Sequence, residues 1–338
     1  LDVSKPFYFR VYSYNSSKTK LYAGQVNIHQ VDPDSVQYHK IADNQSFLNN
    51  TDLKAIAFDG KYYVYAKEVS EVSLYQSTDA KEWTKVTSTS IPADLVVSGI
   101  LANDAGVYGY TASGEFYVSY DATKWINIKT FGENVNYEYP VKAILGFREE
   151  SPMQKAGFSL IVEKENKYIF AFTSDFHEWR YATDTVPGNF PIAGFSTINY
   201  ELAKAEHLSL VSGKNASGEY LNTVWELKDT LEWVLLSDNK FPKLQGANAF
   251  VYDDEFYLMN GQLENGSYNK EVYYSIDKGL NWKIKKEKYF PPSAYPLRKN
   301  ALWLSNAEKT FFYVLGGQNN TNLTDIWQVF LNKKMFAE

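Results

Sequence analysis

The chain contains no cysteine. This absence excludes disulfide bonds, thiolate catalysis and cysteine-bound metal sites. No run of about 18 uninterrupted apolar residues occurs, so we expect no transmembrane helix. The formal net charge of −6 argues against a nucleic-acid-binding surface. Histidine is scarce, and its spacing fits no metal-ligand pattern, so we expect neither a metal nor a cofactor. The four histidines are His29, His39, His177 and His207.

Aromatic residues are abundant instead, at 17% of the 338-residue chain. Tyr and Phe supply most of them and favour strands, which indicates an all-β protein. Within this background a short peptide recurs, with Ser or Thr two residues before Asp in most copies and Trp a few residues after it. Its Asp residues are Asp34, Asp79, Asp121, Asp175, Asp229 and Asp277. Five copies end in Trp83, Trp125, Trp179, Trp233 and Trp282. A repeat every 42 to 54 residues with strand-like runs predicts a β-propeller.

Residues 246–286 show how one repeat is built. Aromatic and β-branched runs at 247–252, 255–261, 271–275 and 281–284, separated by Gly, Asn and Asp, predict four short antiparallel strands. The recurring peptide falls at the turn between the third and fourth strands. Its hydroxyl and carboxylate can bond turn amides, so we interpret it as structural. Metal binding by these Asp residues is the less favoured alternative, because they lie one per blade and do not converge.

The number of blades depends on the two ends of the repeat array. Further units are predicted at 54–86, 96–128, 141–182 and 192–236. The last unit, residues 299–332 with Trp327, has only three strands, and the run at 36–41 can supply its missing outer strand. This pairing would close the ring and remove its open edges, which predicts six blades. Seven blades is the alternative if the N-terminal copy is a separate unit.

Residues 1–31 stand outside the predicted propeller of residues 32–338. Alternating runs at 7–14 and 21–28 predict a hairpin, either an extension or the remainder of a preceding β-sandwich. The first residues lack a basic segment followed by an apolar core, so any signal peptide or lipid-anchor segment would already have been removed. We expect a secreted or cell-surface bacterial protein.

The repeats resemble two known propeller motifs. Residues 275–282 resemble the Asp-box, whereas residues 313–317 followed by 325–327 resemble a kelch repeat, and residues 295–298 resemble its entry into the first strand. With residues 29–35 leading into the ring, the chain is similar to secreted or surface Bacteroidetes proteins of unknown function. Those proteins carry an immunoglobulin-like domain before a kelch-like propeller. The resemblance covers nearly the whole chain and implies a fold rather than an activity.

Two enzyme families share these motifs. Galactose-oxidase-like kelch enzymes need a cysteine cross-linked to tyrosine, and this chain has no cysteine. Sialidases clamp a carboxylate with three converging arginines. Of the four arginines only Arg148 and Arg298 remain as candidates, because Arg10 lies outside the ring and Arg180 on an outer strand. A glycoside hydrolase or lyase that uses two carboxylates at the channel mouth is the alternative function.

The favoured function is noncatalytic binding of a glycan or protein partner. In a propeller, the loops between blades share one face with the loops between second and third strands, and the Asp turns lie on the other. Aromatic and Pro residues gather in the first group of loops, where they offer apolar area to a sugar or peptide, or simply anchor each loop. The predicted contacts are Tyr137, Tyr139, Tyr295 and Arg298.

Overall fold

The computed structural model describes residues 5–14, 18–24, 35–131, 137–151, 154–306 and 309–332. It divides into two compact units, one of which is Val36–Leu331 and the other Leu1–Ser35 with Asn332–Glu338. The second unit contains the predicted hairpin, formed by antiparallel strands β1 (Phe7–Tyr12) and β2 (Thr19–Gly24). The copy of the repeat at Asp34 lies outside the described residues. No helix in the described part of the chain is long and apolar enough to cross a membrane.

The larger unit consists of six four-stranded sheets, the blades of a β-propeller. From the inside outward, blade 1 contains β4 (Leu53–Phe58), β5 (Lys61–Lys67), β6 (Val72–Ser77) and β7 (Thr84–Val86). Blade 2 contains β8 (Leu101–Asn103), β9 (Gly106–Tyr110), β10 (Phe116–Ser119) and β11 (Trp125–Asn127). Blade 3 contains β12 (Val141–Arg148), β13 (Gly157–Lys164), β14 (Lys167–Thr173) and β15 (Trp179–Thr185). Blade 4 contains β16 (Ser196–Leu202), β17 (Ala205–Val211), β18 (Thr223–Leu227) and β19 (Trp233–Asp238). Blade 5 contains β21 (Asn248–Tyr252), β22 (Glu255–Met259), β24 (Tyr273–Ser275) and β25 (Lys283–Ile284). Blade 6 contains β26 (Leu302–Ser305), β27 (Phe312–Leu315), β28 (Ile326–Asn332) and, from the other end of the propeller sequence, β3 (Ser35–Ala42). The predicted all-β, six-bladed fold is confirmed, and the seven-bladed alternative is wrong.

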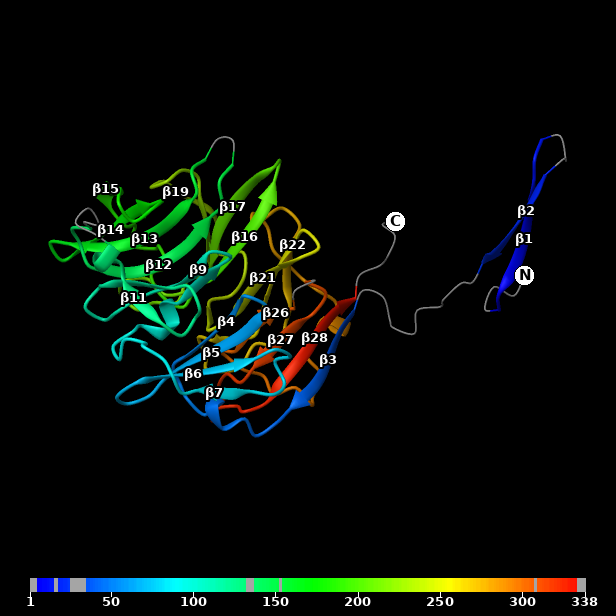
Figure 1. Ribbon diagram of the computed structural model, residues 1–338, viewed down its shortest axis with the longest axis horizontal. Coiled ribbons are helices and arrows are strands. Elements are labelled where there is room, and N and C mark those ends of the chain that lie inside the picture. Colours follow the sequence, from blue (N-terminus) through cyan, green and yellow to red (C-terminus); the bar gives the residue numbers. More distant parts are fainter. Residues whose placement is uncertain are drawn as a thin grey trace. The chain divides into compact units, whose positions relative to one another are not determined.

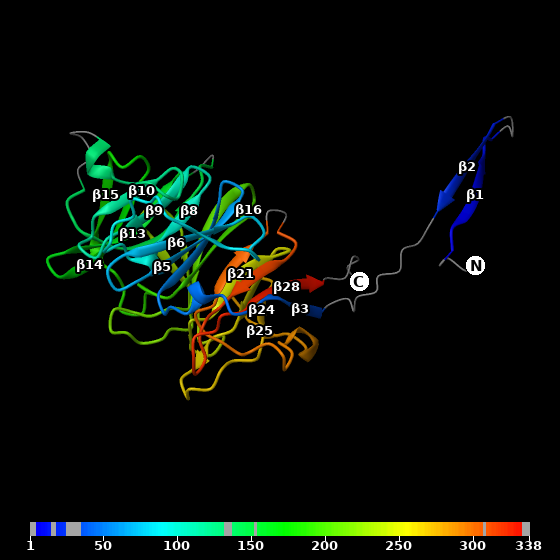
Figure 2. The ribbon, with the colours of Figure 1, turned by 60° about the horizontal axis from the view of Figure 1, so that its bottom comes forward.

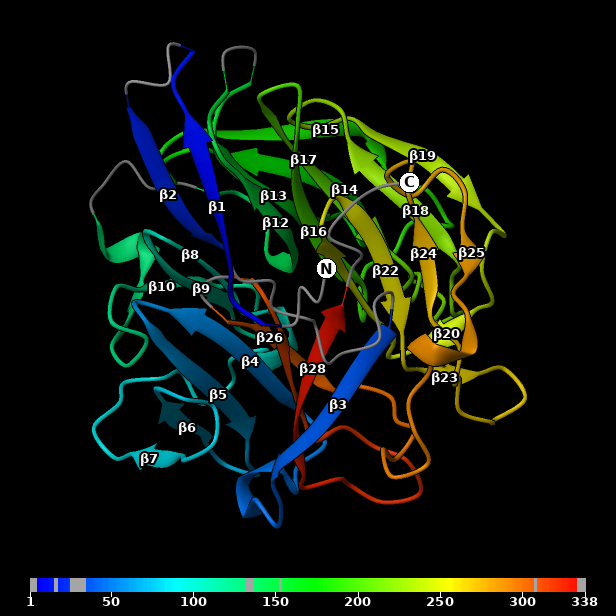
Figure 3. The same ribbon diagram turned by 90° about the vertical axis from the view of Figure 1, so that its right-hand side faces the viewer.

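Short elements occur in the loops, both between blades and between the second and third strands of blade 5. A two-stranded sheet joins β20 (Leu244–Gln245) to β23 (Gln262–Leu263). Within the described residues, single 3-10 turns occur in four connections between blades: η1 (Ser46–Leu48), η2 (Val97–Gly99), η3 (Ile128–Phe131) and η4 (Glu287–Tyr289). Figure 3 shows the sheets following one another around a common centre, with the first strand of each blade innermost.

The ring closes where the two ends of the propeller sequence meet. Strand β3 lies beside β28 as the outermost strand of blade 6, as the sequence predicts. Figure 1 and Figure 2 both show β3, in blue, next to β28, in red. Pairing gives the outer edge of β28 a neighbour and leaves no gap in the ring at blade 6.

The apolar core lies between blades rather than inside any one of them. One cluster combines Ile198 and Val211 of blade 4 with Phe256 and Leu258 of blade 5. Another joins blade 6 to blade 1, through residues such as Leu315 and the fully buried Val64. Each sheet therefore buries its apolar faces only against its neighbours, and a blade alone would leave both faces in water.

The recurring peptide caps its own turn, as expected. Ser77 Oγ donates to Asp79 Oδ1 at 2.9 Å, and the same oxygen accepts the backbone N–H groups of Lys81 and Glu82, both at 2.9 Å. The residue after Asp is left-handed, with φ of 55° at Ala80. Asp121 and Asp175 repeat the two amide contacts. At Asp277 the turn contains Gly279, with φ of 94°, and the carboxylate accepts the backbone N–H of Asn281 instead of two such groups.

The same turns also join neighbouring blades, which the sequence did not reveal. Tyr65 Oη of blade 1 donates to the Ala122 carbonyl of the blade 2 turn at 2.7 Å, and the Tyr65 ring packs edge-on against Trp125. Ser237 Oγ of blade 4 donates to the Gly279 carbonyl of the blade 5 turn at 2.6 Å. The peptide therefore stabilises both a turn and the contact with the preceding blade.

Replacing the turn carboxylate should lower stability. We expect Asp79→Ala to reduce the free energy of unfolding by about 1 kcal/mol, because two backbone N–H groups lose a charged acceptor. Glu82→Ala is the matched control, since it removes an exposed negative charge from the same turn but keeps the backbone donor. Urea unfolding at neutral pH measures the difference, and equal effects of the two substitutions would contradict the assignment.

The effect of Asp79 should also depend on pH. Hydrogen bonds from the backbone N–H groups of Glu82 and Lys81 lower the pKa of Asp79 from its ordinary value of 3.8. A carboxyl with a lowered pKa in the folded state contributes stability above the ordinary value and loses it as the pH falls through the lowered one. The stability gap between wild type and Asp79→Ala should therefore shrink in acid. A gap that stays constant down to about pH 2 would contradict this.

Candidate functional site

The innermost strands of all six blades surround a cavity along the axis of the ring. Its volume is about 1100 Å³, slightly above the range of about 300–1,000 Å³ common for small-molecule sites. We name the end with the connections between blades the loop face, and the end with the Asp turns the turn face. Because the strands of each blade alternate in direction, each inner strand begins at the loop face and ends at the turn face.

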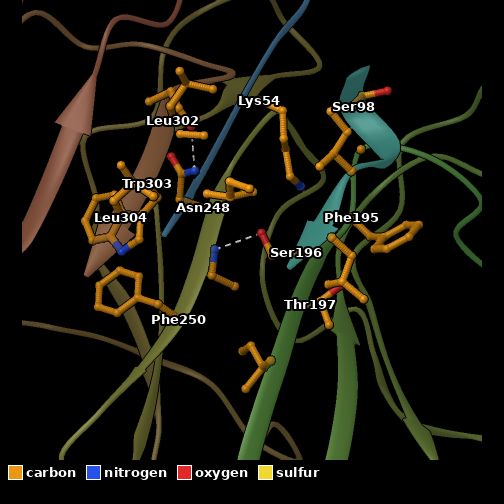
Figure 4. Close-up of a pocket in the computed structure, with 18 of the residues that line it drawn as sticks. Lys54, Ser98, Phe195, Ser196, Thr197, Asn248, Phe250, Leu302, Trp303 and Leu304 are labelled. Atoms are coloured by element: carbon orange, nitrogen blue, oxygen red, sulfur yellow. Dashed lines mark hydrogen bonds between the residues drawn. The ribbon is translucent and has the colours of Figure 1, made fainter. Parts of the chain in front are cut away.

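Several polar side chains near the loop-face end of this wall connect adjacent inner strands. An inner strand pairs on one side only, so its other edge carries free backbone groups. Thr197 Oγ1 of blade 4 donates to the Leu145 carbonyl of blade 3 at 2.9 Å. Ser196 Oγ accepts the backbone N–H of Ala249 at 3.0 Å, and Asn248 Nδ2 donates to the Ala301 carbonyl at 2.9 Å (Figure 4).

Lys54 differs from these side chains. It lies near the loop-face end of β4 and lines the cavity, and Figure 4 shows it directed into the space between the inner strands. Within the described ranges its ammonium group has no hydrogen-bond or ion-pair partner. Burial lowers the pKa of Lys54, and no nearby carboxylate counteracts this shift. This position could not be predicted from the sequence, because the order Leu53-Lys54-Ala55-Ile56 is equally typical of a strand exposed on one face.

Amide side chains gather where the cavity opens at the loop face. A second cavity of about 400 Å³ is lined mainly by the loop between β27 and β28, and it shares Thr51 and Gln318 with the central one. Its other lining residues are Lys299, Asn319, Asn320, Thr321 and Asn322. Lys299 Nζ donates to the side-chain oxygens of Gln245 at 3.1 Å and Gln262 at 2.6 Å. We call the residues of this second cavity the amide rim.

The loop that forms most of the amide rim has a conformation that recurs in blades 4, 5 and 6. After the second strand of each blade comes a glycine with φ near or above 90°, namely Gly213, Gly261 and Gly317. The next residue pairs with the connection that enters the same blade, as Gln318 does with Lys299. A side chain at such a glycine would be strained, and at Gly317 a Cβ would lie 2.8 Å from the Lys299 carbonyl oxygen.

The ligand contacts predicted from the sequence do not form one surface. Arg298 has an exposed fraction of 0%, and its guanidinium meets the Asp325 carboxylate in two hydrogen bonds of 2.7 and 3.0 Å. Tyr295 is 2% exposed and lies 4.2 Å from the Arg298 guanidinium carbon, so neither side chain offers a ligand any surface. The buried Tyr137 accepts the Phe116 N–H through its hydroxyl. Tyr139, half-buried against Tyr181, stays a predicted contact.

The two arginines considered as carboxylate clamps lie apart. Arg298 enters blade 6, whereas Arg148 ends β12 in blade 3, on the opposite side of the ring. Arg148 is 1% exposed, and burial lowers its pKa while the charges of Asp229 and Glu206 oppose that shift. Neither arginine is among the described residues that line the cavity. They cannot converge on one ligand in this arrangement.

The carboxylates that line the cavity divide between its ends. Asp52 precedes β4 at the loop face, and burial raises its pKa while the charge of Lys67 lowers it. Glu201, Asp253 and Asp254 lie at the turn face. Across the described ranges no cluster of three or more His, Asp or Glu side chains could hold a metal ion.

Six four-stranded sheets around a lined channel define a β-propeller. Residues 32–338 match the family described as "DUF6242 beta propeller domain", and the chain belongs to that family. The chain is also similar to a solved structure described as "Structure of YjhT", with 14% sequence identity and a TM-score of 0.54 over 82% of this chain and 94% of that one. Such a likeness concerns the fold alone. No curated protein matches the sequence.

The buried ion pair allows a test of the structural role of Arg298. We expect Arg298→Met and Asp325→Leu each to lower the free energy of unfolding by about 3–5 kcal/mol, because each leaves a buried charge unpaired. The double variant should lose clearly less than the sum of the two. Lys228→Met, in the exposed pair with Glu232, is the control and should change stability by less than about 1 kcal/mol. Strictly additive losses in urea unfolding would contradict the pairing.

Proposed function

We propose that this propeller is a noncatalytic binding module, secreted or held at the cell surface, that binds a glycan at the loop-face mouth of its channel. The observation that carries the proposal is the amide rim beside a cavity of about 1100 Å³. Amide side chains offer both donors and acceptors, which suits the hydroxyl groups of a sugar. The secreted or surface location follows from the resemblance to surface propellers with kelch and Asp-box motifs.

The cavity wall supplies the apolar surface that a sugar ring also needs. The half-buried Trp303 and Phe195 line it, whereas the neighbouring Phe250 is only 7% exposed (Figure 4). Trp303 stacks on Phe250 with ring centroids 4.5 Å apart, which holds the indole in place. Aromatic rings next to orienting polar groups are typical of small-ligand sites.

The recessed shape favours a glycan over a folded protein. A folded partner could cover the amide rim, but its surface would leave the channel behind the rim empty. A glycan chain can place one end in the channel and still contact the rim. A protein partner is therefore the second candidate, and the test below separates the two.

Rim substitutions should weaken glycan binding. On a glycan array we expect the wild-type protein to bind a defined set of oligosaccharides, and Asn320→Ala and Gln318→Ala each to bind about 3- to 10-fold more weakly, the effect of one lost hydrogen bond. Asn189→Ala is the matched control, because Asn189 is exposed in a loop-face connection and does not line either cavity. Tyr139→Ala tests the contact predicted from the sequence.

Three results would count against the proposal. Absence of binding across the array would exclude a glycan ligand, and affinities unchanged by both rim substitutions would exclude this site. Turnover of a chromogenic glycoside, abolished by replacing one channel carboxylate, would identify a glycoside hydrolase or lyase instead.

A further inference from the structure

We propose that the channel selects anionic glycans and that Lys54 binds their carboxylate or sulfate group. This inference rests on the proposed glycan function and names the ligand class for the same site. Its first support is geometric. A single ammonium group extends into the cavity from β4 and has no partner in the part of the chain that the structure describes. Lys54 is half-buried, and a charge that is partly removed from water without a counter-ion costs free energy, which a bound anion would offset.

The neighbouring polar side chains already have partners. Asn248 donates to Ala301 and accepts from Asn260, so both ends of its amide are occupied. The hydroxyl groups of Ser196 and Thr197 bond the backbones of adjacent strands. The closest cavity-lining acid in sequence, Asp52, interacts with Lys67 and has no effect on the pKa of Lys54. The charge of Lys54 is therefore available to a ligand.

A second orphan donor lies on the neighbouring inner strand. Trp303 belongs to β26, which is adjacent to β4 in the ring, and it lines the same cavity. Its indole N–H is buried and has no acceptor among the described residues. An ammonium group and an indole N–H can only donate hydrogen bonds. The indole N–H has almost no exposed surface, so a ligand in the channel would meet the Lys54 ammonium group rather than Trp303, and an ammonium group suits a ligand group made of acceptor oxygens.

The charges along the channel indicate which end the anion enters. Glu201, Asp253 and Asp254 line the turn-face end, where an approaching anion would be repelled despite Lys309 nearby. Uncharged amides dominate the rim at the loop face, and Lys54 is the second residue of β4 from that end. An anionic sugar would therefore enter through the amide rim.

The test compares a sugar acid with its methyl ester, in which the same carboxyl groups carry no charge. Calorimetric titration with tri-galacturonate and with its methyl ester measures how much the carboxylates contribute. We expect the wild-type protein to bind the acid at least about 10-fold more tightly, since a charge-assisted hydrogen bond is stronger than a neutral one. Lys54→Met should remove this preference while leaving the affinity for the ester within 2-fold of wild type. Lys54→Arg should keep most of the preference.

Lys61→Met is the matched control. Lys61 is an exposed lysine of the same blade that does not line the cavity, so its loss should leave the preference unchanged. Thermal unfolding of each variant shows whether it folds, and we expect Lys54→Met to be no less stable than wild type. A sulfated trisaccharide in a parallel titration distinguishes a sulfate from a carboxylate as the preferred group.

The outcomes separate this inference from the proposed function. Equal affinity for the acid and its ester, with rim variants still weaker, would overturn the anion selectivity and leave the glycan function standing. A preference that survives Lys54→Met would overturn the role of Lys54. A tri-glutamate peptide bound as tightly as the sugar would overturn the ligand class, and a protein that binds no oligosaccharide would overturn both proposals.

Discussion

The burial of each sheet against its neighbours is the constraint on which the rest of the structure depends. The clusters that combine Val211 with Phe256, and Val64 with Leu315, show that apolar residues of one blade are covered only by the next. Such an arrangement is stable when the ring is complete, which is why β3 must return to the edge of β28. Closure in turn creates the channel, because six inner strands then face a common axis.

The recurring Asp peptide belongs to this constraint rather than to a ligand site. Its carboxylate bonds amides within the turn, whereas its Trp side chains and turn carbonyls, such as that of Ala122, contact the preceding blade. The copy at Asp229 lacks the hydroxyl residue, which Leu227 replaces, and its carboxylate accepts one amide N–H, from Thr230, in the described structure. A repeated residue of this kind is required for the scaffold, and the face that carries it differs from the one with the amide rim.

The site and the scaffold differ in how their polar groups are satisfied. Asn248 and Thr197 hold neighbouring inner strands together and are saturated, so they shape the channel without recognising a ligand. Lys54 carries the proposal of a bound anion because its ammonium group lines the channel and has no acceptor in the described residues.

The sequence by itself determined the features that depend on short stretches of chain. The turn at Asp79 could be predicted because its hydrogen-bond partners lie two and three residues away in the sequence. The closing strand could be predicted because the C-terminal segment supplies only three of the four strands of blade 6. Only the tertiary structure decided which side chains face the channel. Arg298 looked available to a ligand until its pairing with Asp325, 27 residues away, buried it. Lys54 looked like any exposed strand residue, because the direction of an inner-strand side chain is set by the ring and not by its neighbours in sequence.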